Sequence, residues 1–232
     1  MGEKMQIDVI ARIKTPFDDK FGIPRQSGLA SNLRGEIHFE DKYSDMKAVE
    51  GLEGFEYIWL IWEFEGVWQE EFRPRIRPPR LGGNEYMGVF ATRSPFRPNP
   101  LGLSCVRLER IEETPRGPVL HVSGADLRNN TPIYDIKPYV PYADAHPDAK
   151  EGFTAVTKEY CLKVSEDSQT EELLQVVSED LREGLKQVLA QDPRPAYHDD
   201  PKRVYGMRFA GYEIKFRVEA DTVYVTGVEN DK

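Results

Sequence analysis

The chain has 232 residues, of which 39% are hydrophobic, 11% aromatic and 31% charged, as expected for a globular protein with one main domain and a smaller addition. Its formal net charge of -9 argues on average against a nucleic-acid binder, because Lys and Arg make most phosphate contacts. Nowhere do about 18 apolar residues follow one another, and the first residues lack a signal-like apolar run, so we expect no membrane span.

Charge is unevenly distributed along the chain. Between residues 71 and 110, eight arginines face three glutamates, and between residues 144 and 184 the balance reverses. A basic face on an acidic protein is therefore compatible with the sequence, since a partner feels the local field. Cys105 and Cys161 form no disulfide framework, which predicts a reduced, cytoplasmic setting.

The first part of the chain has short segments rich in β-forming residues and bounded by turn residues. They predict strands at residues 7–13, 35–39, 57–63, 87–92, 104–111, 119–123 and 133–136. One short helix is predicted over residues 45–52, with Ser44 as its N-cap. We expect a mainly β protein in which residues 1–145 form a β-barrel.

The second part, residues 146–232, is predicted to be a small α+β domain. Residues 143–170 are polar and acidic and are interpreted as linker or loosely held surface. Apolar residues then recur every three or four positions, which predicts a helix over residues 171–189 with Thr170 or Ser168 as cap. The Asp192–Pro193 step should end it, and three strands are expected at residues 204–210, 212–218 and 222–228.

The densest chemical signal is the Gly-, Pro- and Arg-rich stretch over residues 73–103. Prolines fix φ and glycines permit positive φ, so such a stretch forms stiff, shaped loops. Arginines on stiff loops suit planar oxyanions, which a guanidinium binds with two hydrogen bonds. The alternative is a structural loop whose arginines pair with surface acids. For the whole stretch we favour a ligand site.

Five motifs in order carry a resemblance to a known family. They are residues 77–103 and residues 24–28 (PRQSG), 126–127 (DL), 131–139 (TPIYDIKPY) and 191–197 (QDPRPAY). With them the chain resembles the TsaA-like / TrmO family. The resemblance implies a β-barrel methyltransferase that moves a methyl from S-adenosylmethionine to N6 of threonylcarbamoyl-adenosine beside the tRNA anticodon. It also implies a homodimer with the site near the subunit boundary, and the tRNA anticodon loop as partner.

The same resemblance implies the cofactor pocket. The residues expected to line it come from four places in the sequence: Gln26, Ser27 and Gly28; Glu65 and Gly66; Arg93 and Leu103; and Asp126, Leu127, Arg128 and Asn129.

The chain departs from the family pattern at two places. Asn129 and Asn130 stand where the family has an acidic residue and a glycine; Asn130 is expected to keep the turn, because Asn tolerates positive φ. Asn129 carries no carboxylate, which puts an acid/base role there in doubt. Glu65 stands where a neutral or histidine-like residue is expected.

Two aspartates are candidates for accepting the proton that leaves the adenine amine. They are Asp126 and Asp135, although an ion pair with Lys137 or Arg93 is the favoured interpretation of Asp135. On the substrate side, Arg97 or Arg194 is expected to bind the threonyl carboxylate.

The 192–197 motif is predicted to contact RNA. Asp192 and Arg194 belong to it, with Tyr197 stacked on an anticodon-loop base. The alternative is a rigid loop that stops the helix and joins the two parts of the chain.

No metal is expected, because the four histidines lack the spacing of ligands. Two other functions stay open. One is a methyltransferase of the same fold acting on a small molecule or another RNA, and the other is a non-enzymatic S-adenosylmethionine-binding sensor.

Overall fold

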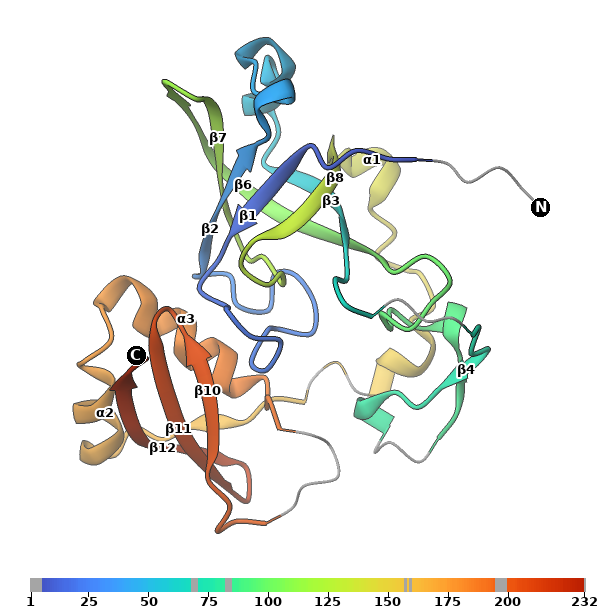
Figure 1. The fold of residues 1–232 in the computed structure, drawn as a ribbon. Helices are drawn as coiled ribbons and strands as arrows, with labels where there is room; N and C mark the ends of the chain where they lie inside the picture. The colour runs from blue at the N-terminus through green and yellow to red at the C-terminus, as the bar shows by residue number, and fades with distance from the viewer. Residues whose placement is uncertain are drawn as a thin grey trace.

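Six strands close a β-barrel in the computed structural model, which describes residues 6–67, 71–81, 85–156, 158, 160–194 and 200–231 (Figure 1). Their order around the barrel is β1-β2-β7-β6-β3-β8. The bounds are Ala11–Lys14 (β1), Arg34–Phe39 (β2), Tyr57–Glu63 (β3), Leu101–Thr114 (β6), Gly117–Ser123 (β7) and Thr131–Pro138 (β8). The predicted barrel is confirmed, and every neighbouring pair in it is antiparallel.

Alternation of apolar and polar residues explains these strands. In β3, Ile58, Leu60 and Trp62 are buried and point inward, while the residues between them face outward. Strand side chains alternate between faces, so one strand supplies both a core row and a surface row. The strand predicted over residues 57–63 has the predicted bounds. The strand predicted at residues 7–13 forms only over Ala11–Lys14.

A second feature is the chain between β3 and β6, whose residues 71–97 we call the arginine lobe. It contains the short antiparallel pair β4 (Arg75–Ile76) and β5 (Met87–Gly88), with 3-10 turns η4 (Pro79–Leu81) and η5 (Val89–Ala91). The strand predicted over residues 87–92 is therefore wrong beyond Gly88. The chain turns there because the Val89 amide bonds to the Pro74 carbonyl and the Thr92 hydroxyl bonds back to the Val89 carbonyl.

The helix predicted over residues 45–52 is wrong. The chain instead forms 3-10 turns at Asp41–Tyr43 (η1), Met46–Val49 (η2) and Leu52–Gly54 (η3), separated at Gly51, whose φ of 84° breaks a helix. Asp45 caps η2 through the Lys47 amide, and the Ser44 hydroxyl donates to the carbonyl of Arg116 instead.

The C-terminal part is a mixed sheet with helices on it, in the order β10-β11-β12-β9. The predicted α+β class is confirmed, although residues 143–170 are more structured than predicted. Its elements are η6 (Gly152–Val156), β9 (Lys163–Val164), α2 (Ser168–Leu174), α3 (Glu179–Ala190), β10 (Tyr205–Phe209), β11 (Tyr212–Glu219) and β12 (Thr222–Asn230). The short helix α1 (Pro141–Asp144) precedes them and is joined to the barrel, because the Trp59 indole of β3 donates to Asp144.

The predicted single helix over residues 171–189 is two helices. Arg182 stabilises the break, because its guanidinium donates 3.1 Å hydrogen bonds to the carbonyls of Leu174, the last residue of α2, and of Val177 in the turn before α3. Asp167 caps α2 through a 2.8 Å bond from the Thr170 amide, so neither predicted cap holds that position.

The described residues form two hydrophobic cores, one inside the barrel and one against the C-terminal sheet. The second core also takes Phe17, Ala30 and Leu33 from the N-terminal segment. The predicted boundary near residue 145 stays a prediction, and the two parts share buried side chains across it. No helix among the described residues has the length and apolar character to cross a membrane.

Candidate active site

A hydrogen-bond chain leads from the barrel core to Asp126. The indole nitrogen of Trp62 donates to the Ser104 hydroxyl (2.9 Å), which donates in turn to Oδ1 of Asp126 (2.5 Å). Ser104 points inward from β6 and is 1% exposed. Burial raises the pKa of Asp126 above the usual Asp value, although the bond from Ser104 opposes that rise. A carboxyl group in this setting suits proton transfer.

The predicted cofactor loop at residues 26–28 lies against the same group. Gln26 accepts a 2.5 Å hydrogen bond from the Arg93 guanidinium, and the Ser27 hydroxyl accepts one from the Cys105 amide (3.2 Å). The Ser27 amide and the Arg93 charge both act to lower the pKa of Asp126. The 26–28 loop, Arg93 and Ser104 of β6, which are far apart in the sequence, thus meet at Asp126.

Gly28 and Gly124 hold this loop close to the barrel. The Gly28 amide donates to the Gly124 carbonyl (2.8 Å), and both residues have positive φ, 82° and 75°. A Cβ on Gly124 would lie 3.2 Å from the Cα of Gly28, whereas one on Gly28 would have no atom within 4 Å. The Gly28 backbone therefore borders open space that a ligand could fill.

Leu103 and Asp135 lie on the outer side of the barrel wall. Ile61 pairs with Leu103 on one side and with Asp135 on the other, which places the three in one row across β6, β3 and β8. Asp135 forms a 2.9 Å ion pair with Lys137 and accepts a hydrogen bond from the Ile136 amide. The two predicted catalytic carboxylates are thus on different sides of the wall: Asp126 bonds an inward-facing serine, and Asp135 stands in the outer row.

Glu65 and Arg128 form an ion pair of 2.8 Å, which joins two of the predicted cofactor segments. The Glu65 carbonyl also accepts from Lys20, at the turn completed by Gly66 with φ 70°. Arg128 explains an acidic side chain at position 65, because it supplies the opposite charge.

The side chain of Leu127 is fully buried, so only its backbone could meet a ligand, and its carbonyl already accepts from Thr15. The amide of Asn129 bonds to Phe17, and its side chain donates to Asp18. Asn130 has a φ of 65°, so the prediction that it keeps the turn is confirmed.

The Asp192 motif meets the cofactor loop. Asp192 and Arg194 form a two-pronged ion pair (2.7 and 2.9 Å) in which each side chain is 10% exposed. The Tyr160 hydroxyl also donates to Asp192, and Arg25, the neighbour of Gln26, donates to its carbonyl (3.3 Å). Burial alone would raise the pKa of Asp192, but the bonds from Arg194 and Tyr160 bring that pKa below the usual value.

The remaining substrate candidates are not brought to this group by any described contact. Arg97 donates to the Thr92 carbonyl at 3.3 Å within its own loop, and Tyr197 lies outside the described residues. No cluster of three or more possible metal ligands occurs within the part of the chain that the structure describes.

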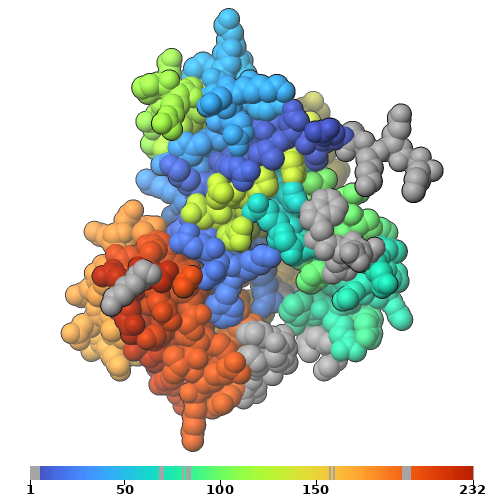
Figure 2. Space-filling view, viewed as in Figure 1, coloured from blue at the N-terminus to red at the C-terminus, as the bar shows by residue number. Residues whose placement is uncertain are grey.

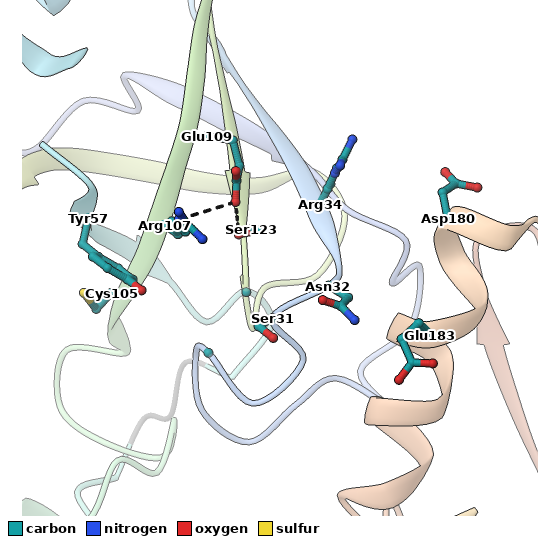
Figure 3. A pocket seen from close by; sticks show the side chains of 12 residues that line it. Ser31, Asn32, Arg34, Tyr57, Cys105, Arg107, Glu109, Ser123, Asp180 and Glu183 are labelled. Carbon is teal, nitrogen blue, oxygen red and sulfur yellow. Dashed lines mark hydrogen bonds and ion pairs between the residues drawn. The ribbon is translucent and has the colours of Figure 1, made fainter. Parts of the chain in front are cut away.

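A cleft of about 460 Å³ opens between the barrel and α3 (Figure 3). Gly28 and Cys105 line it beside the cofactor loop, and Figure 3 places Asp180 and Glu183 of α3 on the opposite side. Burial raises the pKa of the Cys105 thiol, so this cysteine is protonated at neutral pH. Cys105 stands in an outward position of β6 and is half-buried.

Sequence reasoning missed four residues that hold this site together: Ser104, Trp62, Arg25 and Tyr160. Ser104 carried a usable signal, since it is a polar residue at an inward position of an alternating strand. Arg25 lay in the 24–28 motif but was assigned no role, and Tyr160 had no local signal, because the roles of both come from contacts across the fold.

Comparison with known proteins gives the family. The model of the tRNA-methyltransferase O N-terminal domain matches residues 12–145, and the model of the TrmO C-terminal domain matches residues 159–231.

A tRNA (adenine(37)-N6)-methyltransferase of Escherichia coli K12 is 38% identical over 92% of this chain and 93% of its own. A Pseudomonas aeruginosa PAO1 relative, assigned by its name to the S-adenosylmethionine-dependent methyltransferases, is 43% identical over 90% of both chains. The crystal structure of TrmO from P. aeruginosa superimposes with a TM-score of 0.79 at 35% identity, over 99% of both chains. Together with the barrel and the five motifs, these matches show that the chain belongs to the tRNA-methyltransferase O (TrmO) family.

Proposed function

We propose that this chain transfers a methyl group from S-adenosylmethionine to N6 of threonylcarbamoyl-adenosine at position 37 of tRNA. The family and its relatives bear out the predicted enzyme class and methyl donor. The threonylcarbamoyl group on the substrate is the finer part of the proposal. The observation that supports the reaction best is the meeting of the 26–28 loop, Arg93 and Asp126 at one end of the barrel.

The residues at this end fit S-adenosylmethionine. Arg93 presents a guanidinium suited to a carboxylate, and Asp126 presents an anion suited to a cationic group. Leu103, which is 51% exposed, offers an apolar surface to the adenine ring, and Gly28 borders open space. When bound, S-adenosylmethionine supplies an electrophilic methyl on a positively charged sulfur.

The chain's own residues position the acceptor and take up its proton. The N6 lone pair is delocalised into the purine ring, so a nearby base assists the loss of the N6 proton. We assign this role to Oδ2 of Asp126, since Oδ1 already accepts from Ser104. Asp135 is the weaker candidate for two reasons. Lys137 neutralises its charge, and it stands in the outer row, whereas Ser104 faces inward. Stiff loops that align two reactants account for much of such an acceleration.

Arg97 is the favoured partner for the threonyl carboxylate. Its guanidinium makes only the bond to the Thr92 carbonyl among the described contacts, so its charge is available. Arg194 is already paired with Asp192, and binding a substrate would require it to exchange partners. Asp192, Arg194 and Tyr197 remain proposed RNA contacts, because their motif borders the cofactor loop through Arg25.

The test is methyl transfer to two otherwise identical tRNAs, one with and one without the threonylcarbamoyl group, read by mass spectrometry of nucleosides. We expect methylation of the first only, and its loss in Asp126→Asn. Equal methylation of the two tRNAs would show that the enzyme does not require the threonylcarbamoyl group, and would contradict that part of the proposal. Methylation of a small molecule or another RNA alone, or binding of S-adenosylmethionine without turnover, would favour the two other functions.

A homodimer is also part of the proposal. Tyr57, Leu101 and Leu103 lie on the outer face of β3 and β6 and are 39%, 38% and 51% exposed, and groups of exposed apolar side chains mark contact surfaces. Light scattering should give twice the chain mass, and Leu101→Lys should reduce it to one chain.

The cytoplasm, where tRNA is modified, is the proposed location.

A further inference from the structure

The arginine lobe concentrates positive charge on an acidic protein. Residues 71–97 hold six arginines and two glutamates, whereas the whole chain has a net charge of -9. Figure 2 shows the lobe in teal and green standing apart from the orange and red C-terminal part. Within the described residues, no salt bridge neutralises Arg73, Arg75 or Arg77. The local field of the lobe therefore attracts an anionic partner.

Aromatic rings are exposed on the same lobe. Phe72 and Phe90 are 57% and 71% exposed and stack on each other with ring centroids 6.0 Å apart and an interplanar angle of 25°. The β4–β5 pairing and the bond from the Val89 amide to Pro74 hold the two rings together. Exposure of large aromatic rings to water is unfavourable, and a ligand that stacks on them would cover part of that surface.

Two arginines are arranged on a third ring. The guanidinium carbons of Arg77 and Arg75 lie 4.5 and 5.2 Å from the centroid of Tyr86, and Arg77 also donates to its hydroxyl (2.6 Å). Tyr86 is 53% exposed. The ring limits the motion of both guanidinium groups, so less entropy is lost when they bind a phosphate.

Exposed stacked rings beside unneutralised arginines match the chemistry of unpaired nucleotides. Bases stack on aromatic side chains, and arginines meet the phosphates between them. The lobe also continues directly into the site, because Arg93 at its end bonds to Gln26. Charge and rings together favour RNA over a second copy of this acidic chain.

We infer that the arginine lobe is the platform for the unpaired anticodon-loop nucleotides, with Phe72, Phe90 and Tyr86 stacking on bases and Arg75 and Arg77 contacting phosphates. This inference rests on the proposed function and specifies which part of the protein holds the RNA. It assigns the main contact with the anticodon loop to the arginine lobe, which lies between two barrel strands, whereas the motif at residues 192–197 lies in the C-terminal part.

The experiment measures binding of an anticodon stem-loop RNA by fluorescence anisotropy, and of S-adenosylmethionine by calorimetry, with the full chain. Phe90→Ala should weaken RNA binding about fivefold or more, and Phe90→Tyr should retain it. Arg75→Gln combined with Arg77→Gln should weaken it about tenfold and reduce the slope against log salt by about 1.4, for two phosphates on a single strand. Arg116→Gln, at an exposed arginine of the β6–β7 turn, is the matched control and should bind like wild type.

Unchanged melting temperature and S-adenosylmethionine affinity in the lobe variants would show that the loss is specific to RNA. Wild-type RNA affinity and salt slope in the lobe variants would overturn the inference while leaving the proposed function intact. A change of dimer mass with unaltered RNA affinity would also overturn it, by showing a contact between copies. Failure of the wild-type chain itself to bind the RNA or methylate tRNA would refute the proposed function instead.

Discussion

Ser104 donates a 2.5 Å hydrogen bond to Asp126, and this contact connects the barrel core to the site. The Trp62 indole donates to the same hydroxyl and so orients its proton toward the carboxylate. Ser104 therefore acts as a positioning residue.

Ser104→Ala is expected to change the pH profile. The bond from Ser104 lowers the pKa of Asp126, so its loss raises that pKa further. The acid limb of kcat/KM should move to higher pH, with methyl transfer near neutral pH reduced by up to about 100-fold, as for loss of a hydrogen bond to a charged group. Initial rates between pH 5 and about 9 measure it. An equal loss at all pH values would indicate a structural role only.

Asp126→Asn is expected to separate stability from activity. Burial raises the folded-state pKa of Asp126, so the folded chain binds this proton more tightly than the unfolded chain, and stability is lost as the pH rises from the usual value of 3.8 through the raised pKa. The variant carries no such charge, so at pH 7 it should melt at or above the wild-type temperature while losing methyl transfer. A much lower melting temperature at pH 7 would contradict this assignment.

Gly124→Ala is expected to weaken donor binding through the Gly28 backbone. The added Cβ would press on Gly28 and disturb the 2.8 Å bond between the two glycines. Gly51→Ala is the matched control, because Gly51 has a similar φ of 84° but open space around its Cβ. Both should lose about 1–2 kcal/mol of stability from the backbone strain. Only Gly124→Ala should raise the Kd for S-adenosylmethionine, as measured by calorimetry.

Arg194→Ala is expected to cost about 3–5 kcal/mol of stability, because it leaves the buried Asp192 carboxylate without its ion-pair partner. Urea unfolding measures this, and the added Asp192→Asn change should recover part of the loss. The lowered pKa of Asp192 means that the pair stabilises the fold above the usual Asp pKa of 3.8, and that this contribution is lost as the pH falls through the lower folded-state pKa. Arg194→Ala should therefore melt with a weaker acid dependence than wild type.

Asn130→Gly is expected to be tolerated, and Asn130→Val to lose stability. The φ of 65° suits glycine and asparagine, whereas a β-branched residue is strained there. Thermal melting measures the difference, which should exceed about 1 kcal/mol. Wild-type stability of Asn130→Val would show that the turn accepts other backbone angles.

The sequence predicts elements well where one face of a strand is buried. β3 has its predicted bounds because Ile58, Leu60 and Trp62 alternate with outward residues. The helix over residues 171–189 was predicted as one because Leu174 and Val177 fit a helical period, and the period cannot show that Arg182 folds back on their carbonyls. Local patterns report periodicity, whereas the end of a helix depends on which side chain reaches its free carbonyls.

The sequence predicted which segments form the site, but only some of the contacts between their side chains. The motifs located the 26–28 loop, Arg93 and Asp126, which the fold brings together. They did not show that Asp126 and Asp135 lie on opposite sides of the barrel wall, because that depends on strand register. They also did not show that Arg194 faces Asp192, two residues away, in a turn where Asp192 has a positive φ of 51°.

Phe17 and Leu33 pack in the C-terminal core beside Leu185 and Phe216, and this has a consequence for synthesis on the ribosome. The N-terminal side chains emerge early, and their partners are translated more than 150 residues later. The barrel strands are complete at Pro138, so the barrel can close first while these two apolar side chains stay exposed to chaperones. Synthesis of the C-terminal sheet and helices then supplies the partners that bury them, so folding around the loop at residues 24–28 is completed only after that sheet has been made.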